Sequence, residues 1–193
     1  MNISKIFKAI LLSLLVMGVS FGASAQKKGS KDEEYRVVID KPNLKLYVYK
    51  IVPEGEDELE ATYDVCVGTN YGQKQKRGDR KTPEGDFYVS QVQDASSWTH
   101  DFKDGKGVRK GAYGPWFFRL ATPPHSGIGI HGTCFPERIG TRDSEGCIRL
   151  HNEDLVKLKK CVRVGTKVKI LPDKPQANSK NAAQETAPLN KEK

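Results

Sequence analysis

The feature that most constrains this chain is a two-residue alternation of apolar and polar side chains, in short runs separated by turn residues. Residues 35–39 and 44–49 are rich in β-branched and aromatic side chains, and the turn sequence Asp40-Lys41-Pro42-Asn43 separates them. This pattern predicts a β-hairpin. Similar runs at 61–68, 86–92, 116–120, 127–131 and 167–171 predict five further strands. Such a chain is expected to be mainly β, a sandwich or barrel-like domain with a few short helices.

Only one segment has a persuasive helical pattern. Asn152-Glu153-Asp154 is typical of a capped helix start, and the apolar residues Leu155, Val156 and Leu158 follow on one face. Lysines occupy the final turns, where they favour the negative end of the helix dipole. We therefore expect one short helix before the last strand.

The two ends of the chain differ in composition from its middle. A basic start, an apolar run over 9–19 and the small residues Ala23-Ser24-Ala25 predict a signal peptide over 1–25, and hence export to the periplasm or cell envelope. The apolar run is shorter than the roughly 20 residues needed to span a bilayer. Residues 26–34 are polar and predict a flexible leader, and residues 172–193 predict a disordered tail. A single domain is thus expected over 35–171.

The charge of the chain bears on its partners. The formal charge is +8, and removing Lys5 and Lys8 with the signal peptide lowers it to +6. In an exported protein, a mild basic excess indicates a solvated surface or anionic envelope components, and we expect no nucleic-acid partner. Export also permits disulfides, although a domain of this length can bury a core without them. The four cysteines are Cys66, Cys134, Cys147 and Cys161.

Two segments carry neither the strand nor the helix pattern. Residues 72–81 form a glycine-bounded stretch rich in Lys and Arg, here called the basic loop, and residues 94–114 form a long polar stretch. Long ordered loops are often functional, and the alternative for both is a solvated connection. We expect the nearby aromatic residues to pack in the core or in a lid: Trp98, Tyr113, Trp116 and Phe117. We expect three histidines to lie at the surface: His100, His125 and His151.

The densest unusual stretches lie at 128–134 and 144–150. His131 ends an apolar strand, and Cys147 follows a glycine in a turn. An imidazole can take the proton of a thiol, and a glycine before the cysteine exposes N–H groups that can stabilise an oxyanion. This pattern favours a cysteine nucleophile. Two alternatives stay open: a Cys134–Cys147 disulfide, and a zinc site drawn from histidines and cysteines whose spacing lacks any CxxC pair, namely His131, Cys134, Cys147, His151 and Cys161.

Taken together, the motifs of residues 35–171 resemble the L,D-transpeptidase catalytic domain, also called the YkuD domain, of bacterial cell-wall enzymes. The resemblance implies a YkuD-type β fold and no metal or organic cofactor. It rests on the opening strand pair with Leu44-Lys45-Leu46-Tyr47-Val48-Tyr49, on Val65-Cys66-Val67-Gly68, on the TPxGxF-like Thr82-Pro83-Glu84-Gly85-Asp86-Phe87, on His131-Gly132-Thr133 and on Ser144-Glu145-Gly146-Cys147-Ile148-Arg149-Leu150.

The resemblance also implies a role for each site residue. Cys147 is the nucleophile and His131 the general base. The carbonyl of Gly132 would orient the imidazole, and Ser144 would brace the turn over residues 144–147, here called the cysteine loop. The N–H groups of Gly146 and Cys147 would be oxyanion donors. Arg149 could either pair with a substrate carboxylate or bond main-chain carbonyls of the loop, and we prefer the second role.

The implied activity is acyl transfer on peptidoglycan stem peptides, which serve as both donor and acceptor. Cys147 would attack the third residue of a stem, release D-Ala, and pass the thioester to an amine of a neighbouring stem, giving a 3→3 cross-link. Water as acceptor would make the protein a carboxypeptidase, and a lysine of an envelope protein would make it an anchoring enzyme. A Cys147 tied in a disulfide would leave an inactive cell-wall binding module. We expect a monomer.

Two residues depart from the family pattern. Glu145 stands where many members have a histidine, and a carboxylate so close to Cys147 tends to raise the pKa of its thiol. Cys134, three residues after His131, is a second departure. It keeps the disulfide alternative open.

Overall fold

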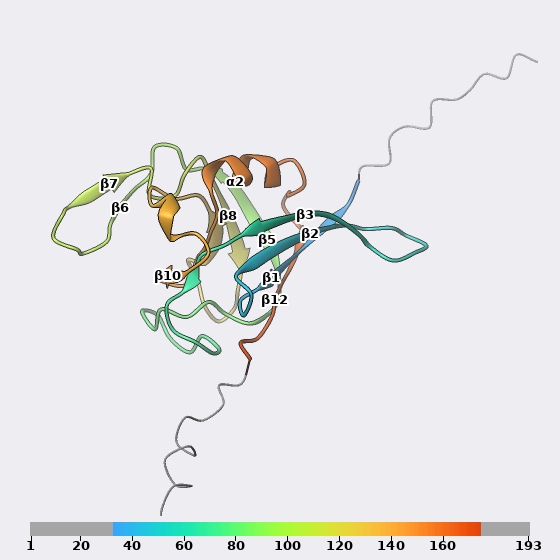
Figure 1. The fold of residues 1–193 in the computed structure, drawn as a ribbon, viewed down its shortest axis with the longest axis horizontal. Coiled ribbons are helices and arrows are strands. Elements are labelled where there is room, and N and C mark those ends of the chain that lie inside the picture. The colour runs from blue at the N-terminus through green and yellow to red at the C-terminus, as the bar shows by residue number, and fades with distance from the viewer. Residues whose placement is uncertain (1–32, 175–193) are drawn as a thin grey trace, which may run out of the picture. The chain divides into compact units, whose positions relative to one another are not determined.

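The computed structural model describes residues 33–174 of the chain (Figure 1). The predicted signal peptide at 1–25 lies outside the described residues, as do most of the predicted leader at 26–34 and most of the predicted tail at 172–193. No helix in 33–174 is long and apolar enough to cross a membrane.

One curled, eight-stranded sheet dominates the domain and confirms the mainly β prediction. Its strands lie in the order β11-β9-β8-β5-β12-β1-β2-β3. In chain order they are β1 (Tyr35–Asp40), β2 (Lys45–Lys50), β3 (Glu58–Asp64), β5 (Gly85–Asp94), β8 (Trp116–Ala121), β9 (Gly129–His131), β11 (Ile148–Arg149) and β12 (Lys167–Ile170).

The predicted hairpin at the start of the domain is confirmed. β1 and β2 pair antiparallel, with Val37 opposite Val48 and Ile39 opposite Leu46. β12 pairs parallel with β1, so the last strand of the domain lies beside the first. The alternation that predicted these strands follows from their burial, because one face of each packs into the core and the other does not.

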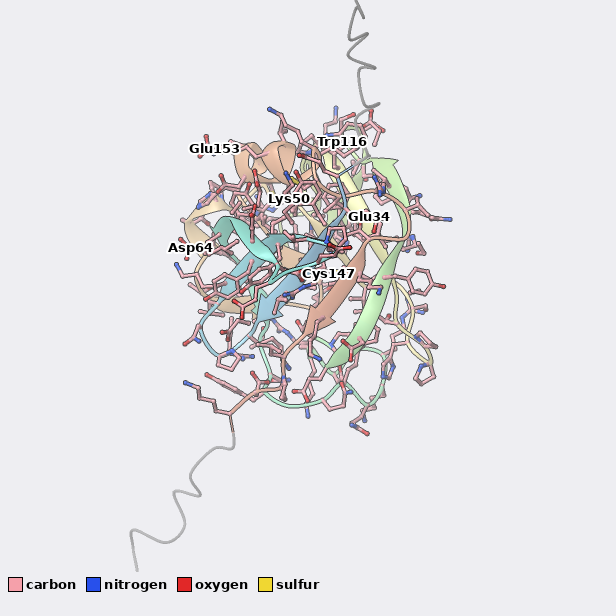
Figure 2. All side chains as sticks on the ribbon, turned by 90° about the vertical axis from the view of Figure 1, so that its right-hand side faces the viewer. Glu34, Lys50, Asp64, Trp116, Cys147 and Glu153 are labelled. Carbon is pink, nitrogen blue, oxygen red and sulfur yellow. The ribbon has the colours of Figure 1, made fainter. Side chains whose placement is uncertain are left out.

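The core lies against one face of the sheet and is covered by α2 (Asn152–Leu158), whose Leu155 and Leu158 are fully buried. Each buried aliphatic side chain contributes about 1.5–3 kcal/mol relative to an exposed one. In Figure 2 the charged side chains of Asp64 and Glu153 lie at the rim of the molecule, while Cys147 lies toward its middle.

Several short elements were not predicted. The expected strand at 61–68 is divided, because β3 ends at Asp64 and β4 (Val67–Gly68) pairs instead with β10 (Arg142–Ser144). The polar stretch at 94–114 contains β6 (Thr99–Asp101) and β7 (Val108–Lys110), which pair as a hairpin that projects from the domain (Figure 1). A 3₁₀ turn, η2, spans Pro136–Arg138. Elements of two or three polar residues are too short to produce a readable period.

A buried cluster of charge joins both ends of the domain. Lys41 was predicted as part of a turn, yet it is 1% exposed. Its ammonium group donates to Glu84 at 2.7 Å and to Asp173 at 3.1 Å, and Asp173 also pairs with Arg142. Burial opposes ionisation of Asp173, but the N–H of Gly72 and the two cations together hold the pKa of its carboxyl below the ordinary value.

Candidate active site

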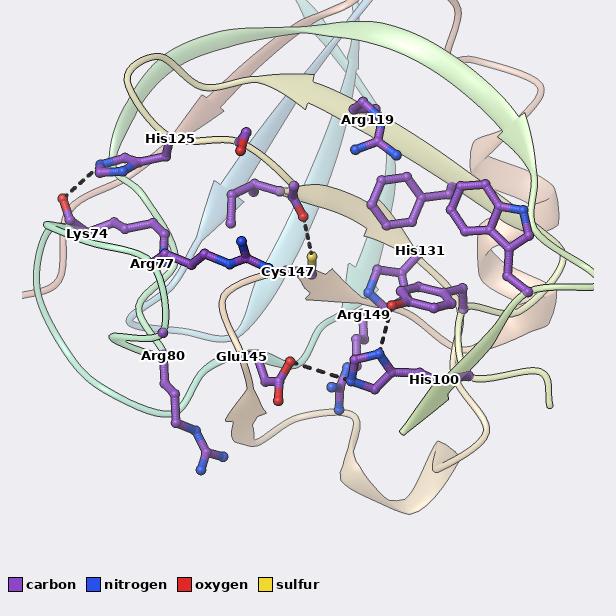
Figure 3. Close-up of a pocket in the computed structure, with 18 of the residues that line it drawn as sticks. Lys74, Arg77, Arg80, His100, Arg119, His125, His131, Glu145, Cys147 and Arg149 are labelled. Carbon is purple, nitrogen blue, oxygen red and sulfur yellow. Dashed lines mark hydrogen bonds and ion pairs between the residues drawn. The ribbon is translucent and has the colours of Figure 1, made fainter. Parts of the chain in front are cut away.

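A pocket of about 770 Å³ opens beside Cys147 (Figure 3). Four segments contribute its walls: the basic loop, the 94–114 stretch with its β6–β7 hairpin, the β8–β9 strands and their connection, and the cysteine loop. Among its lining residues are Lys74, Arg77, Arg80, Trp98, His100, Phe102, Tyr113, Phe117, Arg119, His125, His131, Glu145, Cys147 and Arg149.

Cys147 is half-buried and immediately precedes β11, and its thiol donates to the carbonyl oxygen of Gly127 at 3.4 Å. Burial raises the pKa of this thiol, and the Glu145 carboxylate adds to the effect. The N–H of Gly129 and the cations of Arg149 and Arg119 act in the opposite direction but do not reverse it. The resting group is therefore a neutral thiol at neutral pH, not a thiolate.

His131 ends β9 and is 3% exposed. Its Nδ1–H donates to the carbonyl of its neighbour Gly132 at 2.7 Å, and its ring stacks on Phe117 with the two centroids 5.3 Å apart. Burial lowers the pKa of His131 to about 3, the cation of Arg149 contributes, and the Gly132 bond only partly opposes them. The imidazole is therefore neutral, and since Nδ1 carries the proton, Nε2 is a free proton acceptor.

The cysteine loop is held by Ser144, which is fully buried. Its hydroxyl donates to the carbonyl of Cys147 at 2.6 Å and accepts the N–H of Gly146 at 3.0 Å. The second bond corrects the prediction for Gly146, because its N–H is engaged inside the loop. The N–H of Cys147 is the remaining one of the two predicted oxyanion donors.

Thr82 joins the TPxGxF-like segment to this loop. Its hydroxyl donates to the carbonyl of Gly146 at 2.9 Å and accepts the N–H of Gly68 at 2.8 Å. Gly146 has a φ of +131°, and a Cβ there would lie 2.8 Å from the carbonyl oxygen of Lys81. Only glycine fits this close approach without strain.

Asn152 supports the backbone after His131, a role that the sequence did not indicate. It was predicted to cap α2, but the N-cap residue is His151 and no side-chain cap bond forms. The Asn152 amide instead accepts the N–H of Thr133 at 2.9 Å and donates to the carbonyl of Thr133 at 3.1 Å. A Cβ on Gly132 would lie 2.1 Å from the Asn152 Oδ1 atom, which explains the glycine beside His131.

Arg149 differs from our preferred prediction. Its side chain is 6% exposed and lines the pocket, but within the described residues it forms no hydrogen bond to a main-chain carbonyl, and its buried Nε atom has no partner. The guanidinium lies 5.5 Å from the ring centroid of Phe102 on the β6–β7 hairpin. A buried cation with unsatisfied donors is suited to bind an anion.

Two histidines expected at the surface instead line the pocket. His100 Nδ1 lies 3.0 Å from the Tyr113 hydroxyl, and its Nε2 lies 3.6 Å from the carboxylate of Glu145 (Figure 3). His125 donates through Nε2 to the carbonyl of Lys74 at 3.1 Å. Trp98 and Phe117 each pack edge to face against Tyr113 and lie tilted against each other. All three rings also line the pocket, so they combine packing with a place near Cys147.

The structure also bears on the alternatives for the cysteines. Cys66, Cys134, Cys147 and Cys161 are all free thiols, so the Cys134–Cys147 disulfide is not formed. No group of three or more His, Cys, Asp or Glu side chains that could hold a metal occurs within residues 33–174.

Comparison with known proteins decides the family. The model of the L,D-transpeptidase catalytic domain, YkuD, matches residues 34–170. The chain belongs to this family. It is 30% identical over 157 residues to an L,D-transpeptidase named YkuD from Bacillus licheniformis, a match that covers 80% of this chain and 78% of that protein. It is 32% identical over 126 residues to an L,D-transpeptidase named YqjB from Bacillus subtilis, covering 65% and 72% of the two chains.

Solved structures show the same fold. The helical cell shape determining protein Pgp2 from Campylobacter jejuni aligns with a TM-score of 0.55 at 24% identity, over 75% of this chain and 49% of that chain. An L,D-transpeptidase from Mycobacterium smegmatis aligns with a TM-score of 0.50 at 20% identity, over 72% and 58% of the two chains. The chain therefore spans about half of these longer proteins.

Within this L,D-transpeptidase domain, the six predicted site residues fall into two groups. Cys147, His131 and Arg149 line the pocket. The other three are buried behind the pocket wall: Gly132, Ser144 and Gly146. The Gly132 carbonyl orients His131, the Ser144 hydroxyl bonds to the carbonyl of Cys147, and Gly146 allows the loop to approach Lys81 closely.

Proposed function

We propose that this protein is an exported L,D-transpeptidase that joins peptidoglycan stem peptides by a 3→3 cross-link, through a thioester on Cys147. One observation carries the proposal. His131 has its Nδ1 proton fixed on the carbonyl of Gly132, so that a neutral imidazole with a free Nε2 lines the same pocket as the Cys147 thiol. Family membership adds the reaction class.

The first half-reaction forms the thioester. Nε2 of His131 removes the proton of the Cys147 thiol as the sulfur attacks the carbonyl carbon of the third stem residue. The bond from that carbon to the nitrogen of the fourth residue then breaks, and the imidazolium returns the proton to the leaving amine. Because burial disfavours the charged form of both groups, we place the proton transfer during the attack and not before it.

The second half-reaction forms the cross-link. The amine of a neighbouring stem attacks the thioester carbon, an amide bond forms, and the carbon–sulfur bond breaks. His131 takes the proton of the attacking amine and returns it to the sulfur. An attack by water would release a shortened stem, and an attack by a lysine of an envelope protein would anchor that protein, so the acceptor defines the product.

Arg149 supplies the positive charge of the proposed donor site. Its guanidinium is buried, lines the pocket and has an unpartnered Nε, and the stem peptide carries carboxylates. A substrate carboxylate bound there would satisfy this donor, which the protein leaves unpaired.

Incubation with purified tetrapeptide muropeptides tests the proposal, with the products separated by chromatography and identified by mass spectrometry. We expect 3→3 dimers, together with an acyl-enzyme whose added mass equals the stem without its terminal D-Ala. Cys147→Ala should form neither product and should retain the circular dichroism of the unchanged protein. Tripeptide alone would indicate a carboxypeptidase, and no acyl-enzyme would contradict the proposal.

Exchange of the base gives a second test. His131→Gln should slow formation of the acyl-enzyme by about 10²–10⁴-fold, the usual contribution of a positioned general base. Stopped-flow mass spectrometry of the acyl-enzyme measures this rate apart from cross-linking. An unchanged rate would place the base elsewhere.

A further inference from the structure

The basic loop is one of the two segments singled out in the sequence, and the proposed mechanism gives it no role. Three of its cations, Lys74, Arg77 and Arg80, line the pocket. Lys74 is buried and paired with Asp79, and Arg80 donates to the Thr69 hydroxyl. Arg77 is exposed, and its side chain has no ion pair or hydrogen bond within residues 33–174.

The loop that carries Arg77 is held in place by a single buried carboxylate. Asp79 accepts from the Lys74 ammonium at 2.6 Å, from the N–H of Gln75 at 2.7 Å, and from the N–H groups of Lys76 and Lys81 at 3.1 Å each. Two of these donors are the main-chain groups immediately before Arg77. The backbone of Arg77 is therefore fixed before any substrate binds, which lowers the entropy lost on binding.

Neighbouring segments fix the basic loop from outside. His125 donates to the carbonyl of Lys74, and the Gln73 side chain donates to the carbonyl of Glu84 at 3.0 Å. The N–H of Gly72 donates to Asp173 at 2.6 Å. An exposed arginine on a loop anchored at both ends is a preorganised binding group, unlike an arginine on a free surface loop.

Figure 3 shows the Arg77 side chain extending from this loop into the pocket on the side of Cys147. The other pocket arginines near Cys147 are engaged or buried: Arg119 donates to Gln93 and lies over Phe117, and Arg149 lies beneath Phe102. Arg77 is thus the exposed and uncommitted cation in the described pocket that points toward the nucleophile.

We propose that Arg77 binds the free carboxylate of the residue that leaves when Cys147 is acylated. This inference rests on the proposed function. The carboxylate of a terminal residue follows the attacked carbonyl by one residue of extended chain, about 3.3–3.6 Å. A guanidinium binds a carboxylate through two parallel hydrogen bonds, so it can distinguish a chain that ends there from one that is amidated or continues.

Two donors that differ in one group test the inference. One is a stem tetrapeptide with a free carboxylate on its terminal D-Ala, and the other is the same stem ending in D-alaninamide. For the unchanged protein, we expect kcat/KM of acylation to be about 10- to 100-fold higher with the carboxylate donor. Arg77→Gln should remove most of that preference by slowing the carboxylate donor alone. Arg77→Lys should retain part of it.

Lys76→Gln is the matched control, because Lys76 lies in the same loop, carries the same charge and is not among the lining residues. It should leave both rates unchanged. A third donor, amidated on another carboxyl of the stem, identifies the group that is bound: the loss should not appear there. Equal acylation by the first two donors, or an equal loss with both in Arg77→Gln, would overturn the inference and leave the proposed function standing. No acylation by any donor would overturn both.

Discussion

The two irregular walls of the pocket are held in contrasting ways. The basic loop is held by buried polar interactions. Lys74 and Asp79 form an ion pair with side chains only 5% and 8% exposed, and main-chain N–H groups donate further hydrogen bonds to the Asp79 carboxylate. The β6–β7 hairpin is held mainly by ring contacts to residues outside it, since Phe102 contacts Phe135 and His100 contacts Tyr113. Its ion pairs, such as Lys103–Asp101, are exposed.

This difference indicates how far each wall can move. Buried, directional bonds have one good geometry, and breaking them leaves an unpaired charge, so the basic loop presents fixed cations. Edge-to-face ring contacts are weaker and tolerate sliding, and exposed ion pairs contribute little. The hairpin is therefore the wall that can adjust, and the basic loop is the wall whose geometry is fixed.

The largest expected effect comes from breaking the anchor of the basic loop. Asp79→Ala leaves the Lys74 ammonium buried without its partner and should lower the free energy of unfolding by about 3–5 kcal/mol. Urea denaturation measures the loss. Adding Lys74→Met should recover much of it, because no buried charge then remains. A loss below 1 kcal/mol in the single variant would show that the basic loop is held no more strongly than the hairpin.

The same carboxylate predicts a dependence on pH. Burial opposes ionisation of Asp79, but Lys74 and three main-chain N–H groups outweigh it and hold the pKa of the carboxyl below its ordinary value. The unfolded chain therefore binds a proton at higher pH than the folded one. The stabilisation is fully present above the usual aspartate range, begins to be lost as pH falls through that range, and is lost completely only below the lowered pKa of the folded state. The stability gap between the unchanged protein and Asp79→Ala should shrink between pH 7 and pH 3 in urea titrations. A constant gap would contradict this origin.

A smaller effect concerns the ring contacts of the hairpin. Phe102→Ala removes its contacts with His100, Phe135 and the Arg149 cation and should lower the free energy of unfolding by about 1 kcal/mol. Because Arg149 is then more exposed, KM for the donor should rise more than kcat falls. Steady-state kinetics separate the two, and Val108→Ala, an exposed position of the same hairpin, is the control.

Charges from the two sides of the pocket should shift the pKa of the Cys147 thiol in opposite directions. Glu145→Gln removes a carboxylate that raises the pKa of Cys147, and Arg119→Gln removes a cation that lowers it. Alkylation by iodoacetamide, which reacts with the thiolate, should move to lower pH in the first variant and to higher pH in the second, by less than about one pH unit. Shifts of the same sign would refute the assignment.

The smallest effect is expected on the exposed side of the hairpin. Asp101→Asn breaks the ion pair with Lys103, whose side chain is 83% exposed, and should change the free energy of unfolding by less than about 0.5 kcal/mol. Its contrast with Asp79→Ala compares one carboxylate from each wall under the same denaturation protocol.

The strands that build the core were predictable from the sequence, since burial on one face imposes the two-residue alternation that Val37 and Ile39 show. The short elements β6, β7 and β10 were not, because they are polar and pair only with each other or with another short strand. Similarly, the placement of Cys147 and His131 in one pocket followed from motif and family resemblance. The partners of His100 and Asn152 depend on tertiary approach and leave no local pattern.

Arg149 illustrates the same limit at a charged residue. From the sequence, both a structural and a binding role were open, because an arginine in a short strand has the same local pattern in either case. What separates them is whether nearby carbonyls approach the guanidinium, and that is decided by the fold. The Lys41 turn is a parallel case, since its burial depends on Asp173, far along the chain.

The buried Lys41–Asp173 pair also tells an experimenter where this domain can be trimmed or fused to another protein. The family match ends at residue 170, and Leu171 still bonds to the backbone of β1. A recombinant version that ends at residue 170 lacks Asp173. Lys41 and Arg142 would then lose their ion pairs with Asp173, and the N–H of Gly72, at the start of the basic loop, would lose its acceptor. Affinity tags and fusion partners are therefore best attached after residue 174, so that Asp173 and its ion pairs are retained.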